Sequence, residues 1–504
     1  MPFESHNTWT HDAHTVQFGI DFTREGKSEL ANPSNNNTNG TFAFTGQYTG
    51  NALADFLTGH AYRYTETALD PFLNYRWFNL EPFVEDQIKL RPNLTLTVGL
   101  RYEYFQPEYE KNNVFGTFNP LLFNVSEAPV VNPDGTLVPN TGAPLNGIMI
   151  AGPNSPYGRA LFPARTNNLA PRVGVAWDPQ NDGKTAVRIG YGIFYDRWGS
   201  YSQFGDTNPP FNNTVSITNT SLSNPGGAAG TPYPPALNGV QSPWKYPQVQ
   251  KWSVSVQREV GFQTSLSAAY VGTKGTHLLG PLNLNQPLPS ANVANDAISP
   301  DAVRPYLGYS TITGYETRFS STYNALQLSA IHRLQAGLTF QMSYTYSKTL
   351  TDSNGGFSNS PQDSRNLRAE KALASFDVPH ILTFNYAWDV PIFRRSAGLT
   401  KAAFGGWQVS GITNIQSGFP LTVTLPFDNA GVGGGLERPN QVASSSGPKT
   451  VQQWFNTDAF ALPAAGTFGN APNGAVRGPG VINWDFGLSK QFRLREEMSL
   501  RFRA

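Results

Sequence analysis

Apolar and polar residues alternate with period two through most of the chain. Val16, Phe18, Ile20 and Phe22 form one such run, and a longer run extends from Leu94 to Tyr104. The same alternation recurs at 173–177, 187–195, 252–256, 266–270, 326–330, 338–346, 382–388, 407–409, 484–488 and 498–502. Successive side chains of a β-strand point to opposite faces, so each run predicts a strand with one apolar and one polar surface.

Other periodicities are weak. Residues 78–90 fit a strand less well, because Asp86 falls on the same face as Val84 and Ile88. Modest helical patterns occur only at 50–57 and 365–374. The pattern therefore predicts an all-β chain of about thirteen strands, namely one strand at 15–23 followed by six hairpins.

The connections between these strands alternate in length. Short links lie at 91–93, 179–184, 260–263, 335–337, 391–405 and 494–496, and the link at 391–405 is the least regular. Longer loops lie at 107–170, 197–248, 275–322, 351–379 and 425–481. Short turns at one end and long loops at the other are typical of a transmembrane antiparallel β-barrel with periplasmic turns and extracellular loops. The same parity assigns residues 61–69 to an extracellular connection.

Composition narrows the class of protein. Charged residues make up 14% of the 504 positions and the net charge is +1, which argues against a basic nucleic-acid-binding face. Aromatic residues reach 13%, which excludes a mainly disordered chain. There is no cysteine, and no apolar stretch approaches the length of about 20 residues that a helical membrane span needs.

Aromatic residues cluster where predicted strands meet loops. Amphipathic rings prefer the membrane–water boundary, and membrane barrels carry girdles of them. The expected interface residues are Tyr102, Tyr104, Tyr195, Trp198, Tyr344, Tyr346, Trp388 and Trp407. A large soluble β protein would also be rich in tyrosine and tryptophan, so this signal gains its weight from the loop alternation.

Charged residues on the polar strand faces are the candidates for function. If the registers hold, the lumen-facing set is Arg101, Glu103, Arg188, Asp196, Lys251, Arg333 and Asp485. Lumen charges tune selectivity in barrels, and they also pair with one another as a structural lining. We expect these residues to contact a plug or to line the lumen more often than to contact substrate directly.

Catalytic, cofactor and metal motifs are absent from the sequence. His11 and His14 have no third ligand nearby, and neither HExxH nor GxSxG occurs. The glycine run 431–435 lacks the Lys-Ser/Thr that follows a phosphate loop, and we expect it to be a flexible part of a long loop. We therefore expect no enzyme activity, no cofactor and no metal.

Four runs resemble the barrel of TonB-dependent receptors of the Oar-like type. They are FVEDQIKLRPNLTLTVGLRYEYFQP (83–107), NNLAPRVGVAWDPQNDGKTAVRIGYGIFYDR (167–197), SFDVPHILTFNYAWDVP (375–391) and GGWQVSGITNIQSGFPLTV (405–423). The resemblance covers essentially the whole chain in order. It implies an outer-membrane location in a Gram-negative-type bacterium and a barrel of about 22 strands with a plugged lumen.

Several parts of that family plan are missing here. The start, MPFESHNTWTHD, has no signal-peptide pattern, and no TonB box, plug or regulatory-like β-sandwich is present. The end, RFRA, resembles the start of a strand and lacks the C-terminal aromatic signal of the family. We therefore expect residues 1–504 to be one partial barrel domain, and the chain to be a fragment.

The resemblance implies active import. Extracellular loops and lumen would capture a siderophore, glycan or peptide, and the TonB complex of the inner membrane would supply energy by pulling on the missing plug. The partners would be outer-membrane lipid, the TonB complex and an unidentified extracellular ligand. One alternative is an adhesive or structural surface barrel, which needs neither plug nor TonB box. Another is a secreted all-β carbohydrate-active enzyme, which would need paired carboxylates and no detergent for extraction.

Overall fold

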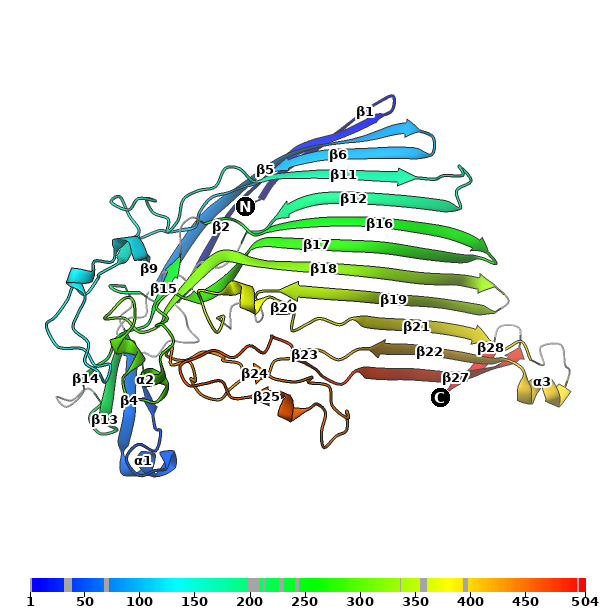
Figure 1. Cartoon of the computed structure of the whole chain (residues 1–504). Coiled ribbons are helices and arrows are strands. Elements are labelled where there is room, and N and C mark those ends of the chain that lie inside the picture. The colour runs from blue at the N-terminus through cyan, green and yellow to red at the C-terminus, as the bar shows by residue number, and fades with distance from the viewer. Residues whose placement is uncertain are drawn as a thin grey trace.

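The protein is a large antiparallel sheet with a packed assembly of loops at one end. The computed structural model describes residues 2–30, 39–67, 72–197, 208–211, 214–225, 231–240, 244–335, 337–353, 360–392, 398–495 and 498–504. Long strands lie side by side in one curved sheet, and the longer connections gather at one end of it (Figure 1). The all-β barrel-type fold predicted from the alternation is confirmed.

Fourteen long strands in the described residues build this sheet. They are β1 (Pro2–His11), β2 (His14–Leu30), β5 (Phe72–Arg91), β6 (Leu94–Tyr102), β11 (Leu169–Trp177), β12 (Thr185–Tyr195), β16 (Gln248–Gly261), β17 (Thr264–Asn283), β18 (Ile312–Gln335), β19 (Leu338–Thr351), β21 (His380–Asp389), β22 (Trp407–Gln416), β27 (Val481–Arg495) and β28 (Met498–Arg503). Each pairs antiparallel with the next in this order, which makes an up-and-down meander. Within the described ranges no ladder joins β1 to β28, so the sheet is open (Figure 1).

Shorter elements lie in the connections. A separate four-stranded sheet contains β3 (Thr41–Ala43), β4 (His60–Thr67), β13 (Thr214–Ser221) and β14 (Thr231–Pro232). The main sheet is extended by β7 (Tyr104–Phe105), β8 (Tyr109–Glu110), β9 (Gly116–Phe118), β10 (Ile148–Ile150), β15 (Leu237–Val240) and β20 (Ala372–Leu373). Two small ladders join β23 (Pro420–Leu421) to β26 (Val476–Arg477) and β24 (Asn440–Gln441) to β25 (Phe460–Ala461).

The helices are short. They are α1 (Ala52–Thr58), α2 (Ala291–Ala294) and α3 (Gly398–Phe404), with 3₁₀ turns at Pro120–Leu122, Val125–Glu127, Pro300–Ala302, Leu367–Glu370 and Thr457–Ala459. In the described part of the chain, no helix has the length and hydropathy to cross a membrane.

Strand β1 is one strand more than the alternation predicted. It pairs with β2 along its whole length, from Phe3 opposite Phe22 to His11 opposite His14. Ser5 and Asn7 interrupt its apolar face, so no period-two run is visible in the sequence there. The prediction of an unpartnered first strand was therefore wrong, because an edge strand can form without strict alternation.

The loop alternation is confirmed. Seven shorter links join the fourteen strands in pairs; six of them are tight, and the one between β21 and β22 is longer and contains α3. Six longer connections run at the opposite end (Figure 1). Residues 60–67 form β4 in the separate sheet, which agrees with the assignment of 61–69 to a connection; residues 68–69 lie outside the described residues.

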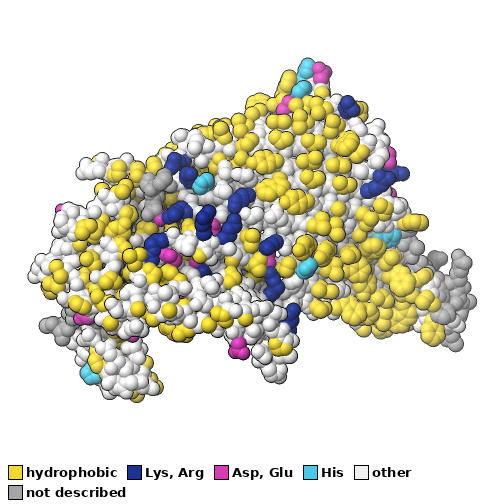
Figure 2. Space-filling model, in the orientation of Figure 1, with side chains coloured by type: hydrophobic (Ala, Val, Ile, Leu, Met, Phe, Trp, Pro, Cys, Tyr) yellow, Lys and Arg dark blue, Asp and Glu magenta, His cyan; other side chains and the backbone are white. Residues whose placement is uncertain are grey.

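One face of the sheet carries an exposed apolar band. Val98 pairs with Val173, and Ile189 pairs with Val254, and each of these four side chains is more than 40% exposed. Hydrophobic side chains gather over the strands, whereas Lys and Arg gather where the strands meet the loops (Figure 2). A continuous exposed apolar band is what a barrel presents to lipid.

The packed core lies outside this band, in the loop assembly. The largest cluster of buried apolar residues includes Tyr75, Phe115, Phe162 and Trp244, all with less than 2% exposure. Extensions of β5, β17 and β18 contribute to it, because these strands are 20 to 24 residues long, whereas about 9–11 residues cross a bilayer. The loops are therefore built on strand extensions and are packed like a soluble domain.

Candidate functional site

The strand registers decide which charged residues share the polar face. Arg101 follows the lipid-facing Leu100, Arg188 precedes Ile189, and the other predicted residues in strands likewise lie opposite the apolar band. This places Arg101, Arg188, Lys251, Arg333 and Asp485 on the polar face, with Glu103 and Asp196 just beyond the ends of β6 and β12. Whether any of them contacts a plug or a ligand stays a prediction.

Arg101 is the centre of a charged cluster on this face. Its guanidinium donates to the Asp21 carboxylate, and its Nε lies 3.4 Å from Oε2 of Glu81. The guanidinium also lies over the ring of Phe83, with Cζ 5.3 Å from the ring centroid. His6 joins the cluster through Nε2, which lies 2.8 Å from Oδ1 of Asp21. Strands β1, β2, β5 and β6 thus bring these groups together.

Glu103 continues the cluster towards the loops. It is 6% exposed, and its Oε2 is buried without a hydrogen-bond partner among the described residues. The Asn168 side chain donates to the Glu103 carbonyl at 2.9 Å, and the charges of Arg101 and Arg172 act on the carboxylate. The Glu81 carboxylate acts on it as well, so Glu103 is a buried carboxylate with charges of both signs around it.

The remaining predicted lumen residues fall into separate groups. Lys251 Nζ and Arg172 Cζ both lie over the Phe194 ring, at 5.4 and 4.8 Å from its centroid. The main-chain N–H of Asp196 donates to Pro247 at 3.0 Å. Towards the tight turns, Arg188 and Arg333 line one cavity of about 540 Å³. Asp485 lines another cavity with Arg503, and its carboxylate accepts from Asn483 at 3.0 Å.

One group of possible metal ligands occurs among the described residues. Donor atoms of Glu4, His6 and Asp21 lie within 4.8 Å of one another, but the Arg101 guanidinium already occupies Asp21 and would repel a cation. His14 pairs with Asp86 at 2.7 Å and His11 with Asp12 at 3.3 Å, so the two histidines do not form a joint site.

The predicted interface aromatics lie on the lipid side of the register. Tyr102, Tyr195, Tyr344 and Tyr346 lie towards the loop ends of their strands, and Trp388 and Trp407 lie beside the link between β21 and β22. Tyr104 opposes Leu80 in the extension of β5. Trp198 lies outside the described residues. Their role at the membrane boundary remains a prediction.

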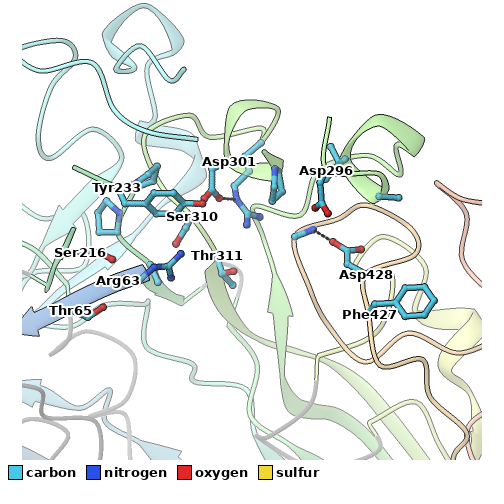
Figure 3. Close-up of a pocket in the computed structure, with 18 residues that line it drawn as sticks. Arg63, Thr65, Ser216, Tyr233, Asp296, Asp301, Ser310, Thr311, Phe427 and Asp428 are labelled. Carbon is cyan, nitrogen blue, oxygen red and sulfur yellow. Dashed lines mark hydrogen bonds and ion pairs between the residues drawn. The ribbon is translucent and has the colours of Figure 1, made fainter. Parts of the chain in front are cut away.

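The loop assembly contains an open cavity of about 560 Å³ that no sequence pattern marks (Figure 3). Arg63 of β4 lies over the rings of Tyr62 and Tyr233, with Cζ 5.3 and 4.8 Å from their centroids. Tyr233 hydrogen-bonds Asp301, and burial followed by this contact raises the pKa of Tyr233 to about 12. Asp296 lines the wall beyond Asp301.

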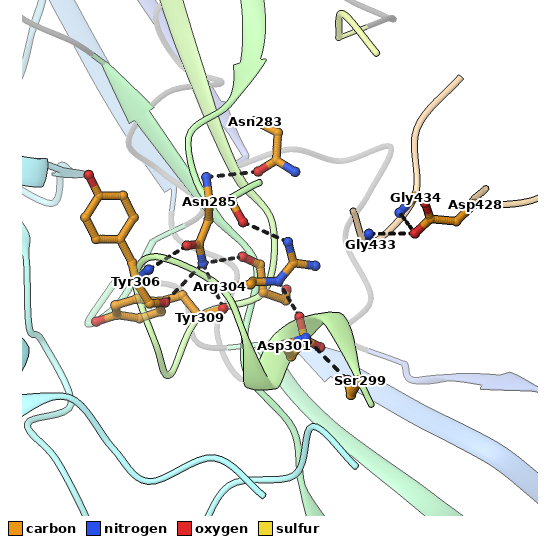
Figure 4. Close-up of polar contacts among 11 residues, drawn as sticks. Asn283, Asn285, Ser299, Asp301, Arg304, Tyr306, Tyr309, Asp428, Gly433 and Gly434 are labelled. Atoms are coloured by element: carbon orange, nitrogen blue, oxygen red, sulfur yellow. Dashed lines mark hydrogen bonds and ion pairs between the residues drawn. The ribbon is translucent and has the colours of Figure 1, made fainter. Parts of the chain in front are cut away.

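A hydrogen-bond network fixes the 284–311 wall of this cavity (Figure 4). The Asn285 side chain is fully buried and donates to the carbonyls of Tyr306, Tyr309 and Ser310 at 2.8–3.0 Å. Arg304 donates to the Asn285 carbonyl at 2.9 Å and pairs with the Asp301 carboxylate. A satisfied buried network of this kind holds a loop in one conformation.

The glycine run 431–435 wraps around a carboxylate rather than lying as a flexible loop. Asp428 accepts from the N–H groups of Val432, Gly433 and Gly434 at 2.6–3.0 Å. Gly433 and Gly434 have φ values of 83° and 97°, which glycine adopts without strain. The expectation of flexibility was wrong, because the run forms a nest of N–H donors whose anion comes from the same loop.

Glu437 completes this acidic pair. It is 1% exposed, and its Oε2 accepts from the Ala430 N–H at 2.9 Å. Burial and a hydrogen bond with Asp428 raise the pKa of Glu437 to about 8. Burial opposes the charge on Asp428, but hydrogen bonds from Glu437 and from the 432–434 N–H groups outweigh it and lower the Asp428 pKa. The pair therefore holds one proton at neutral pH.

Two arginines clamp the later loops together. Arg438 donates to both carboxylate oxygens of Glu370 at 2.8 and 2.9 Å, and Arg477 donates to Asp377 at 2.7 Å. Each pair joins the 352–379 connection to the 417–480 connection. No sequence signal marks these pairs, because their members lie 68 and 100 residues apart.

The fold and the polar wall define an integral β-barrel protein of the bacterial outer membrane. The family model described as "Outer membrane beta barrel domain" matches residues 2–504, and the chain belongs to this family. No curated protein matches the chain.

Solved outer-membrane transporters match the chain at low sequence identity. The outer-membrane transporter YddB from Escherichia coli is 12% identical with a TM-score of 0.51, and the match covers 98% of this chain and 48% of the YddB chain. The FrpB iron transporter from Neisseria meningitidis is 10% identical with a TM-score of 0.45, and the match covers 100% of this chain and 50% of the FrpB chain. The siderophore receptor PirA from Acinetobacter baumannii is 9% identical with a TM-score of 0.44, and the match covers 100% of this chain and 49% of the PirA chain. The chain spans about half the length of these proteins, and the YddB match supports a shared barrel fold.

Proposed function

We propose that the chain is the barrel portion of a TonB-dependent receptor of the Oar-like type, which imports a large ligand across the outer membrane. The observation that carries this proposal is the packed loop assembly with its cavity, built on extensions of the same strands that form the lipid-facing sheet. Residues 1–504 would form a single barrel domain. The resemblance of residues 83–107, 167–197, 375–391 and 405–423 to that family supports the same assignment.

In this proposal the chain does no bond chemistry. The loops select the ligand, and the charged wall around Arg101 and Glu103 contacts either a plug or the passing ligand. Energy comes from the TonB complex acting on a plug, and the barrel supplies a fixed, lipid-anchored path. A plug surface of complementary charge would neutralise groups such as the unpartnered Glu103 oxygen.

A ligand-independent experiment tests this function. The gene and the tonB gene are deleted separately in the source bacterium, and growth is compared across arrays of single carbon, nitrogen and iron sources. We expect at least one source whose use is lost in both deletions and restored by returning the gene. If loss of the gene abolishes surface attachment while growth matches the parent on every source, the protein is an adhesive barrel and the import proposal fails.

A further inference from the structure

The loop cavity presents opposite charges on two sides of an internal ion pair. Arg304 and Asp301 neutralise each other, and both are about 3% exposed. Arg63 lies on one side of Asp301 and Asp296 on the other (Figure 3). The cavity therefore has a cationic end and an anionic end, with no excess of cation that would favour a polyanion.

At the cationic end, Arg63 is placed to bind a carboxylate. The Arg63 guanidinium lies over the rings of Tyr62 and Tyr233, and its Nη2 donates to Tyr62 Oη at 3.4 Å, which leaves other N–H groups of the guanidinium for a ligand. Its Nε is buried and has no hydrogen-bond partner among the described residues. An unpaired buried donor costs about 1–3 kcal/mol, which a bound acceptor recovers. The edge of a guanidinium matches a carboxylate through two parallel hydrogen bonds.

At the anionic end, Asp296 and Asp428 are placed to bind an ammonium group. Asp296 is exposed, with a backbone φ of 57°, and no side-chain partner of its carboxylate is recorded among the described residues. Asp428 lines the same end, and the N–H groups of the glycine run fix its position. Two carboxylates here place negative potential where the far end of a ligand would lie.

We propose that this cavity binds a short peptide by its two termini, with the carboxylate on Arg63 and the ammonium group at Asp296. Asp301 lies between the two ends (Figure 3), which favours a peptide over a single amino acid. Hydroxyls of Ser310 and Thr311 lie between the two ends and that of Ser216 lies at the Arg63 end, and all three can bond to peptide amides (Figure 3). The volume of about 560 Å³ lies in the range of about 300–1,000 Å³ of small-ligand pockets. This inference rests on the proposed import function, since it names the class of ligand that the loops capture.

Calorimetry on the full chain, folded in detergent, tests the proposal with trialanine, N-acetyl-trialanine and trialanine amide. We expect trialanine to bind and each blocked peptide to bind at least tenfold more weakly. Arg63→Gln should abolish the difference between trialanine and its amide, and Asp296→Asn should abolish the difference between trialanine and its N-acetyl form. Such pairwise non-additivity assigns each terminus to its residue.

Asp458→Asn is the matched control, because Asp458 is an exposed loop carboxylate that does not line the cavity. It should leave all three affinities unchanged, and circular dichroism should show that every variant is folded. Equal binding of free and blocked peptides, or binding of maltotriose with none of trialanine, overturns the proposal. Neither result bears on TonB-dependent growth, so import and peptide recognition fail separately.

Discussion

Arg438 and Glu370 form a two-pronged ion pair in the interior of the loop assembly. The Nη1–Oε2 and Nη2–Oε1 distances are 2.8 and 2.9 Å, and the two side chains are only 4–5% exposed. Asn473 also donates to Oε2 of Glu370 at 2.9 Å, so this oxygen accepts two hydrogen bonds. The pair holds the 352–379 connection against the 417–480 connection. Within the residues described, the strand pairing of the main sheet and its exposed apolar band do not join these two connections.

Replacing Arg438 by Met should destabilise the loop assembly by about 3–5 kcal/mol, because the Glu370 charge is left buried and unpaired. Hydrogen exchange of residues 360–379 and 420–477, followed by mass spectrometry, measures the effect. The double variant Arg438→Met, Glu370→Leu should recover most of the lost stability, since it also removes the buried, unpaired carboxylate of Glu370. A single variant that exchanges like the parent protein would show that the clamp is not needed.

The Asp428–Glu437 pair predicts loosening of the glycine loop at alkaline pH. The Glu437 pKa is raised from 4.5 to about 8, so its stabilising contribution is complete below pH 4.5 and is lost as pH rises to about 8. The lowered pKa of Asp428 acts in the opposite sense and matters only under acid conditions. Amide exchange at residues 430–434, corrected for intrinsic rate, should therefore rise between pH 6 and 9.

Glu437→Gln separates this effect from general alkaline instability. A glutamine amide donates to Asp428 at every pH, so the corrected exchange should become independent of pH between 6 and 9. Asp428→Asn should instead raise exchange at every pH, because the three N–H groups lose a charged acceptor. A pH profile in Glu437→Gln identical to that of the parent would exclude the shared proton as the cause.

The sequence predicts the sheet far better than the loops, for a physical reason. Lipid requires every outward position to be apolar, so strands such as 94–104 show their pairing face in the sequence. Strand β1 was not predicted, because Ser5 and Asn7 interrupt the apolar alternation in this edge strand of the sheet. The polar face follows directly from the alternation, which is why Arg101 could be placed on it in advance.

The cavity could not be predicted in this way. Its wall combines residues near 63, 216, 233, 296 and 428, which come from four different connections. Loop residues meet through specific hydrogen bonds such as those of Asn285, and such bonds leave no periodic signal. The glycine run at 431–435 was visible, but its anion, three residues upstream, was recognised only from the geometry.

Arg101 should stabilise the polar wall through its two carboxylates. Arg101→Gln leaves Asp21 and Glu81 facing each other without their shared cation, and we expect a loss of about 1–3 kcal/mol in resistance to urea. All three side chains are 20–24% exposed, so the loss should be smaller than for the buried Arg438 pair. Adding Asp21→Asn should recover part of it, whereas an additive double variant would argue against a direct pair.

Neighbouring positions on β16 give the sharpest test of which face meets lipid. Val254 is 44% exposed in the apolar band, and Ser255 points to the polar face beside Arg188. Val254→Arg places a charge in hydrocarbon and should cost about 2–4 kcal/mol near the bilayer midplane. Ser255→Gln, a polar change of similar bulk on the opposite face, should cost less than about 1 kcal/mol. The yield of protein in the outer-membrane fraction and its urea midpoint in lipid measure both. Equal loss in the two variants would mean that the faces are assigned wrongly, because a shift of one residue in register exchanges them.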